Sequence, residues 1–326
     1  MSDLTDWTLL RSFLAVLRRG SLSAAARETG LTQPTIGRHV DELEAGLGLA
    51  LFTRSPGGLL PTPGARSLLP HAEAMETAFA ALKRAATLGG DEGNPRGTVR
   101  IAASEVMGTF VLPSLLAVLR GRYPGIILEL ALNNRTDDLL RRDADIAVRM
   151  TRPKQDGLVA RKLGTVPLGL YAHRAYLDRY GLPESLEDLA RHHVIGFDRD
   201  DHSARAVAAG TLPISRDLFS FRVDSDVAQV MALRAGLGIG MIQKAMAKAD
   251  PALVPVLPDR VAIELECWLV VHEDQKDAAP IRALFDGLAE GLLRWMERRG
   301  VKCAGVPGIG RTESDLVPGR NLTNVL

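Results

Sequence analysis

The chain has 326 residues, of which 46% are hydrophobic and 24% charged, and its formal net charge is +1. At roughly 150 residues per domain, this length suggests two or three domains. No run approaches the roughly 18 apolar residues of a membrane span, and the first residues lack the basic and apolar regions of a secretory signal. Two cysteines, Cys267 and Cys303, are too few for a disulfide framework. We therefore expect a cytoplasmic protein with reduced thiols.

The first predicted element is an amphipathic helix. Its apolar residues recur every three or four positions, at Trp7, Leu10, Leu14 and Leu17. This spacing places them on one helical face. Asp6 is the expected N-cap, and Gly20 can end the helix in a left-handed conformation.

Two further helices are expected close behind the first. Ser21 caps a short one that ends at Gly30, and Leu31 is expected to be buried in the turn that follows. Thr32 caps the next, with Pro34 in its first turn, where a missing N–H costs nothing. The buried stripe of this third helix is predicted to be Ile36, Val40, Leu43 and Leu47.

The open face of the third helix carries the candidate binding residues. Its polar residues are Gln33, Thr35, Arg38 and His39. Glutamine pairs well with adenine and arginine with guanine in the major groove, and the N–H groups at a helix start can hold a phosphate. Two short helices joined by a tight turn, with such a face on the second, indicate a helix-turn-helix. The alternative, that Arg38 is a solvated surface arginine, is disfavoured because the cap, proline, stripe and polar face agree.

A β-hairpin is predicted over residues 52–62, with a Pro-Gly-Gly tip that makes it a wing. Arg54 on this wing would reach phosphate or the minor groove, the alternative being an ordinary turn residue. The first 65 residues contain six arginines and six acidic residues. DNA binding is therefore argued from the positions of the arginines and not from bulk charge.

A long helix is predicted from Thr62 to about Ala86, with a kink near Pro70. Its apolar face has no partner within its own small domain, so we expect an antiparallel partner from a second subunit. The alternative is packing against its own chain. Residues 87–97 are rich in glycine and are predicted to form a flexible joint.

From Thr98 onward, short apolar runs alternate with helical patterns, up to a last helix at Ala279–Arg298. This alternation predicts a parallel sheet with covering helices. A glycine-rich run at 236–240 follows a helix and leads into a strand, the reverse of a dinucleotide fingerprint. His192, His193 and His202 match no compact metal spacing, and no nucleophile motif is present.

These stretches resemble a known family. Residues 7–64, through FLAVLRRGSLSAAARETGLTQPTIGRHVDELEAGLGLALFTR and LLPTPGA, resemble the DNA-binding domain of LysR-type transcriptional regulators. That family usually has serine and glutamine where this chain has Gly37 and His39. The resemblance extends over residues 97–299, which look like the family's effector-binding domain. It implies an N-terminal all-α winged helix-turn-helix with a long linker helix, plus a C-terminal α/β domain of two lobes, similar to periplasmic binding proteins.

The resemblance also implies domain boundaries. The DNA-binding domain would cover 1–64, the linker helix and hinge 65–96, and the effector-binding domain 97–299. Lobe one would comprise 97–166 and 270–299, and lobe two 168–268, with crossing strands near 167–171 and 267–271. The tail, 300–326, is predicted to be disordered.

The implied function is regulation of transcription, with double-stranded promoter DNA and a small-molecule effector as partners. A homodimer would form through the linker helix, a homotetramer through the C-terminal domains, and RNA polymerase would be affected through the DNA bend. No cofactor, metal, catalytic residue or membrane is implied. The predicted DNA contacts are Ser21, Ser23, Thr32, Gln33, Pro34, Thr35, Arg38, His39 and Arg54.

A ligand site is expected in the cleft between the lobes, because strand C-termini and helix N-termini converge there. Candidate effector contacts at strand ends are Ser104, Arg149, Thr151, Phe197, Asp198 and Ser225. Each could instead be a cap or turn residue, and Arg149 a surface arginine. In the cleft, Arg149 would favour a carboxylate-bearing effector. Two rival functions are a solute-binding protein with an incidental helical domain, which lacks an export signal here, and an enzyme, which lacks a catalytic constellation.

Overall fold

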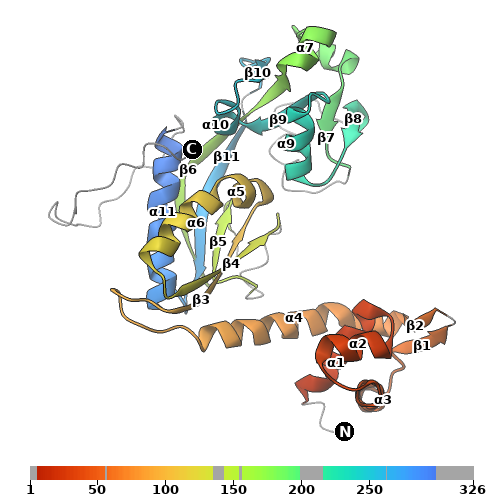
Figure 1. Cartoon of the computed structure of the whole chain (residues 1–326). Coiled ribbons are helices and arrows are strands. Elements are labelled where there is room, and N and C mark those ends of the chain that lie inside the picture. Colours follow the sequence, from red (N-terminus) through yellow and green to blue (C-terminus); the bar gives the residue numbers. More distant parts are fainter. Residues whose placement is uncertain are drawn as a thin grey trace.

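The computed structural model describes residues 6–55, 57–134, 143–153, 156–198, 216–261 and 263–298. The tail at 300–326, which is expected to be disordered, lies outside these ranges. Figure 1 shows a small N-terminal helical domain, a long helix that leads away from it, and an α/β region of two lobes. None of the helices in the described ranges is long and apolar enough to cross a membrane.

The N-terminal helices are α1 (Trp7–Arg19), α2 (Leu22–Thr29) and α3 (Gln33–Leu47). Their expected caps are confirmed, because Asp6, Ser21 and Thr32 each accept a hydrogen bond from a backbone N–H of the first turn. Gly20 and Gly30 end α1 and α2 at φ angles of 70° and 74°. These local capping interactions set where each helix begins and ends.

A compact core holds the three helices together. It is built around fully buried side chains from α1, α3 and the segment before the wing, namely Phe13, Leu14, Ile36, Leu43 and Leu51. The predicted burial of Leu31 and Leu47 is wrong, since each side chain is 37% exposed. Both lie at helix ends, in the α2–α3 turn and the last turn of α3, where no neighbouring helix covers them.

The wing consists of β1 (Phe52–Ser55) and β2 (Gly58–Pro61), paired antiparallel. It docks on the corner between α1 and α2, where the N–H of Leu59 donates to the carbonyl oxygen of Gly20 at 2.8 Å. Gly58 has a φ of 122°, and a Cβ there would lie 2.5 Å from the same oxygen. Only glycine permits this close approach.

We expect Gly58→Ala to lower the free energy of unfolding of the N-terminal domain by about 2 kcal/mol, because it adds backbone strain to the collision with Gly20. Denaturant unfolding of the full chain measures this change. Gly57→Ala is the matched control, since its Cβ would meet only the Ser55 Oγ at 3.9 Å. Equal stability of the two variants would contradict the docking argument.

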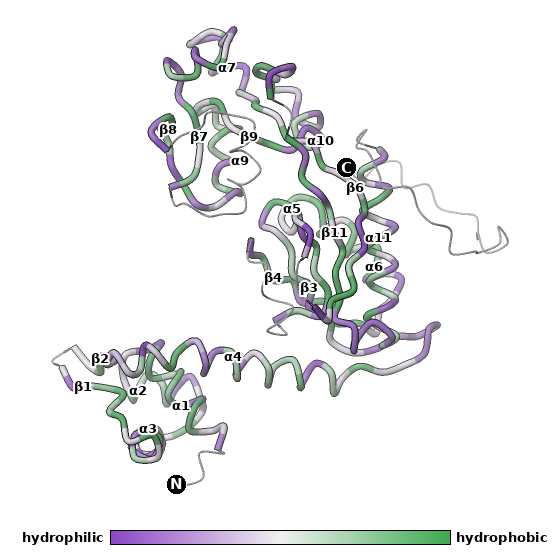
Figure 2. Tube along the Cα trace, turned by 180° about the vertical axis from the view of Figure 1, so that it is seen from behind, coloured by the Kyte–Doolittle hydropathy of each residue, from purple (hydrophilic) through white to green (hydrophobic). Residues whose placement is uncertain are grey.

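Helix α4 (Pro63–Ala85) begins after its N-cap Thr62, where the long helix was expected to open, and continues through Pro70. Hydrophobic and hydrophilic segments alternate along it (Figure 2). One side packs on α1 through Ala65 and Ala72. Further along, large apolar side chains remain exposed at Met75, Phe79 and Leu82.

Within the described ranges, nine strands form one sheet that runs through both lobes, in the order β4-β3-β5-β11-β6-β9-β7-β8, with β10 paired to β6. The bounds are β3 (Gly97–Ala103), β4 (Ile126–Leu132), β5 (Ile146–Arg149), β6 (Leu158–His173), β7 (Val194–Gly196), β8 (Phe219–Arg222), β9 (Ile239–Gln243), β10 (Leu253–Val256) and β11 (Ile263–His272). The expected parallel sheet is confirmed within each lobe and is wrong for the two long strands. Although β3 is parallel to β4 and β5, and β7 to β8 and β9, the long strands β6 and β11 are antiparallel to their neighbours.

The two long strands connect the lobes, as Figure 1 shows. Residues 268–271 of β11 pair with β5 in lobe one, whereas Ile263 pairs with Leu168 at the edge of lobe two. The crossing of β11 therefore lies before Trp268, earlier than the expected 267–271. The apolar pattern changes at this position, because Glu264 and Glu266 alternate with apolar residues whereas residues 267–271 are continuously apolar.

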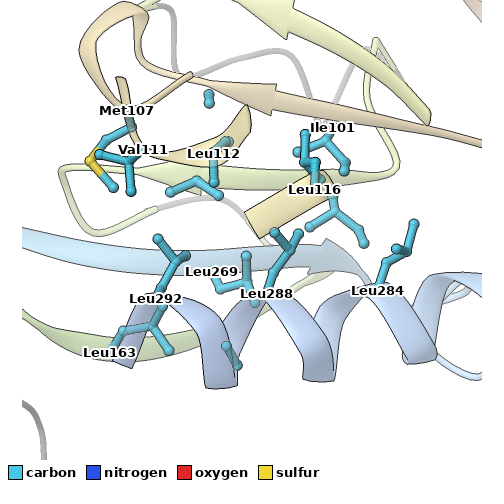
Figure 3. Close-up of a cluster of buried hydrophobic side chains, with 14 of the residues drawn as sticks. Ile101, Met107, Val111, Leu112, Leu116, Leu163, Leu269, Leu284, Leu288 and Leu292 are labelled. Atoms are coloured by element: carbon cyan, nitrogen blue, oxygen red, sulfur yellow. The ribbon is translucent and has the colours of Figure 1, made fainter. Parts of the chain in front are cut away.

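Helices cover both lobes. They are α5 (Glu105–Phe110), α6 (Leu112–Arg122), α7 (Arg174–Tyr180), α9 (Asp226–Arg234), α10 (Lys244–Ala247) and α11 (Ala279–Arg298), with 3₁₀ turns at Glu187–Arg191 and Arg216–Leu218. In lobe one, leucines of α6 and α11 face each other, as Figure 3 shows for Leu112, Leu116, Leu284 and Leu288. Lobe two has its own core around Tyr176, Val194 and Ile239.

Candidate nucleic-acid interface and interlobe site

A groove of about 440 Å³ lies between the start of α2, one face of α3 and the wing. It brings together four of the predicted DNA contacts from three separate elements, namely Ser21, Ser23, Gln33 and Arg54. Ser21 also caps α2 through its Oγ, which accepts from the Ala24 N–H at 3.2 Å. The wing thus forms the second wall of a surface whose first wall is the start of α3.

The N-terminus of α3 is exposed. The Oγ1 of Thr32 accepts from the Thr35 N–H at 3.4 Å and lies 2.8 Å from the Thr35 hydroxyl. The two threonines therefore order the first turn, while Gln33 and Pro34 are exposed beside them. Arg38 lies one turn further on and is exposed. This arrangement can offer a hydroxyl pair, an amide and a guanidinium to a polyanion.

His39 does not lie on the open face, so its predicted place there is wrong. Its side chain is only 8% exposed, and its Nδ1 lies 2.8 Å from the buried Oγ of Ser12 on α1. The physical reason is helical periodicity, since position 39 follows Ile36 by three and precedes Leu43 by four. The same spacing rule that found the stripe could have found His39. The residue holds α3 against α1.

The lobes meet along α5 and α9, where polar side chains join them. The Ser225 Oγ donates to the Glu105 Oε2 at 2.8 Å, and the Asn134 Nδ2 donates to the Asp226 Oδ2 at 2.9 Å. Ser225 is also the N-cap of α9. Of these four residues the sequence indicated Ser225 as a candidate contact, whereas Glu105 and Asn134 lie in a helix or loop with no distinguishing pattern.

Two buried polar atoms near this junction have no hydrogen-bond partner among the described residues. They are the Oγ of Ser104, at the end of β3, and the Oε1 of Gln243, at the end of β9. The Gln243 amide reaches lobe one, since its Nε2 lies 3.7 Å from the Met107 sulfur. Buried polar groups are normally paired, so these two mark a place where a polar ligand would gain hydrogen bonds.

The other predicted effector residues are more dispersed. Arg149 is buried at the end of β5, and its Nη1 donates to the Asn133 carbonyl oxygen at 3.0 Å. Thr151 and Phe197 are half-buried. Asp198 is exposed and accepts from the Arg216 Nη2 at 2.6 Å, so this carboxylate already has a cationic partner.

Both parts of the chain match models of one protein family. Residues 7–66 match the bacterial regulatory helix-turn-helix protein model of the lysR family, and residues 92–293 match the LysR substrate binding domain. The second match alone spans more than half of the chain.

The chain belongs to the LysR family.

Relatives and solved structures of the LysR family agree along nearly the whole chain. A probable HTH-type transcriptional regulator, LtrA of Klebsiella pneumoniae, is 28% identical over 292 residues, covering 86% of this chain and 93% of the relative. The transcriptional activator AaeR of Escherichia coli K12 is 27% identical over 286 residues, covering 84% of this chain and 85% of its own.

Among solved structures, CrgA of Neisseria meningitidis is 25% identical with a TM-score of 0.54, covering 89% of this chain and 99% of that one. The full-length CbnR structure, solved with its target DNA, shares the fold at 22% identity and a TM-score of 0.62, with coverage of 89% and 100%. This LysR-family chain is therefore a DNA-binding transcriptional regulator with an effector-binding domain. The rival of a solute-binding protein with an incidental helical domain is not supported, because the helical part matches the family in its own right.

Sequence reasoning missed one residue that orders the regulator's DNA-binding surface. The Glu44 Oε1 accepts from the backbone N–H of Leu51 at 2.6 Å and of Phe52 at 3.1 Å. Glu44 lies on α3 and Phe52 begins the wing, so one carboxylate ties the two together. The sequence gives no local sign of this role, because Glu44 lies seven and eight positions before its two hydrogen-bond partners.

We expect Glu44→Ala in this regulator to leave two backbone N–H groups without their acceptor and to destabilise the wing by about 1–3 kcal/mol. Hydrogen exchange at Leu51 and Phe52 measures this directly. Glu42→Ala, an exposed acidic position on the same helix, is the control for lost negative charge. If both variants exchanged at the same rate, Glu44 would not order the wing.

The DNA-binding domain of the regulator is also fixed to α4. Arg18 donates two hydrogen bonds to Glu76, at 3.2 and 2.6 Å, and these raise the pKa of Arg18 above its usual value. The centroids of the Trp7 and Phe79 rings lie 5.4 Å apart.

The thiol of Cys267 is buried, and burial raises its pKa to about 12, which disfavours the reactive thiolate.

Proposed function

We propose that two copies of the chain, paired through α4, bind an interrupted palindrome in promoter DNA. The N-terminus of each α3 enters a major groove, where Gln33, Thr35 and Arg38 meet base edges and phosphates. Arg54 on the wing contacts the neighbouring backbone or minor groove. The observation that carries this proposal is the exposed start of α3 beside the wing, with Ser21, Ser23, Gln33 and Arg54 around one groove.

Pairing through α4 is supported by its exposed stripe. Met75, Phe79 and Leu82 are 49%, 42% and 64% exposed and recur at spacings of four and three. Such a row lies on one helical face, and burying it against a second α4 removes apolar surface from water. The C-terminal domains would pair further to give a tetramer. A protein that binds promoter DNA would lie in the cytoplasm.

The effector is proposed to bind between the lobes, near Ser104 and Gln243, where two buried polar atoms have no partner among the described residues. Arg149 supports a carboxylate-bearing effector. Its guanidinium, which donates to the Asn133 carbonyl oxygen, would favour a carboxylate in this region. Thr151, Phe197 and Ser225 would line the same region from the strand ends and the start of α9.

The effector acts by binding two arrangements of the chain with different affinities. A change in lobe or subunit geometry would alter the spacing or angle of the two DNA-binding domains. The DNA bend would change with it, and so would access of RNA polymerase to the promoter.

The test combines a mobility shift with the DNA upstream of the protein's own gene and a thermal-shift screen of carboxylates on the full chain. A retarded complex whose mobility or affinity changes with a stabilising carboxylate supports the proposal. A carboxylate present at about 100 times its Kd should add about 2.7 kcal/mol of stability. DNA binding without any carboxylate response would overturn the effector class and leave the DNA-binding surface in place.

A further inference from the structure

A buried ion pair joins the end of the linker helix to the effector-binding domain. The Arg84 Nε donates to the Asp145 Oδ2 at 3.1 Å. The two residues are only 7% and 2% exposed, although they lie 61 positions apart in sequence. Removing one partner of such a pair leaves an uncompensated buried charge, so the contact strongly favours one arrangement.

Asp145 is itself fixed to β3. The same Oδ2 accepts from the Arg100 N–H at 2.8 Å, and the Asp145 N–H donates to the Arg100 carbonyl oxygen at 2.8 Å. One carboxylate oxygen therefore accepts hydrogen bonds from both the linker helix and β3, a central strand of lobe one. The guanidinium is therefore held beside β3 by a carboxylate that lies just before β5.

The segment after α4 adds further ties, so the expected flexible joint is in fact hydrogen-bonded. The Thr87 Oγ1 donates to the Arg84 carbonyl oxygen at 2.7 Å and accepts from the Thr98 N–H at 2.9 Å. Gly89 and Arg96 exchange two backbone hydrogen bonds, at 3.0 and 2.9 Å. The joint thus returns the chain to the foot of α4 and places β3 directly beside it.

The strands beside the foot of α4 also lead to the region between the lobes where the effector is proposed to bind. Asp145 immediately precedes β5, whose last residue is Arg149, about 13 Å away at the usual rise of a strand. β5 lies between β3, which ends before Ser104, and the crossing strand β11. The foot of the linker helix and the effector region are therefore opposite ends of the same short strands.

We propose that Arg84 and Asp145 are positioning residues that set the direction of α4, and hence of the DNA-binding domain, relative to lobe one. They lie at the foot of α4, away from the groove beside α3 and at the opposite end of β5 from Arg149. Their role is to make lobe one and the linker helix move together, so that a change at the proposed effector site reaches the DNA.

The experiment measures a distance distribution between spin labels on Ala80→Cys in α4 and Ala117→Cys in α6, both exposed positions. Cys303→Ser removes the other thiol to be labelled, while the buried Cys267 stays. Labelled chain is mixed with a large excess of unlabelled chain, so that distances within one subunit are recorded. The variants are Arg84→Met, Asp145→Asn and the double substitution, with Lys83→Met as the matched control on the same turn.

We expect the distribution to broaden by about twofold in Arg84→Met and in the double variant, and to stay narrow in Lys83→Met. The double variant carries no unpaired buried charge, so its thermal unfolding shows whether the fold is retained. The angle of bound operator DNA, measured by fluorescence transfer between the DNA ends, should change in the same variants. A folded double variant with the distribution and DNA angle of the unmodified chain would overturn the proposal and leave the ion pair with a role in stability alone.

Discussion

Replacing Arg38 with alanine will weaken operator binding by about 10- to 100-fold at moderate salt. An arginine that makes a bidentate contact to a base is worth about 1–3 kcal/mol of discrimination. Arg38 is exposed one turn beyond the ordered Thr32–Thr35 pair, on a helix whose opposite face is buried. Mobility-shift titrations of the full chain against operator DNA measure the loss.

The salt dependence separates two roles of Arg38. If it reads a base, Arg38→Ala should relax the sequence preference at one operator position. If it contacts a phosphate, binding should weaken evenly across sequences and the slope against log salt should fall by about one. Arg260→Ala, an exposed arginine of lobe two, controls for the lost positive charge. Unchanged affinity in Arg38→Ala would remove α3 as the recognition helix.

Polar substitution of the exposed stripe of α4 should separate the regulator into monomers. In Met75→Lys with Leu82→Lys, two charges would have to enter the proposed helix–helix interface, where burial without a partner is costly. Lysine is a good helix former, so α4 itself should persist. Phe79 is left in place because its ring packs near Trp7.

The monomer should also lose operator affinity by about 100-fold or more, because two linked DNA-binding domains gain affinity through their effective concentration. Light scattering after gel filtration gives the mass, and a mobility shift gives the affinity. Glu73→Lys, an exposed change off the stripe of the same helix, is the control. A dimer that persists in the double-lysine variant would place the interface elsewhere.

The parts that sequence predicted best are those set by local interactions. Caps at Asp6, Ser21 and Thr32 all appear where expected, because a cap depends on three or four consecutive residues. The bounds Ala279–Arg298 of the last helix also agree. The alternation of apolar runs with helical patterns predicted the strands, because each strand carries its own local pattern.

What sequence could not supply are contacts between distant residues. The Arg84–Asp145 pair and the Glu105–Ser225 bond, which spans 120 positions, leave no periodic signal. The antiparallel direction of β6 and β11 could not be predicted either, because an apolar run has the same pattern in a parallel and an antiparallel sheet. The burial of His39 could have been predicted, because its spacing from Ile36 and Leu43 places it on the buried face of α3. It was missed because histidine is a polar residue type.

The single carboxylate of Glu44 has a consequence for how the regulator can be controlled. Because it joins the start of the wing to α3, the surface proposed to bind a half-site is held in one arrangement. In the proposed dimer, an effector would then change the angle or distance between the two DNA-binding domains and not the sequence preference of either one. Selection of preferred sequences with and without effector should therefore yield the same half-site letters, with only the spacer between them changed.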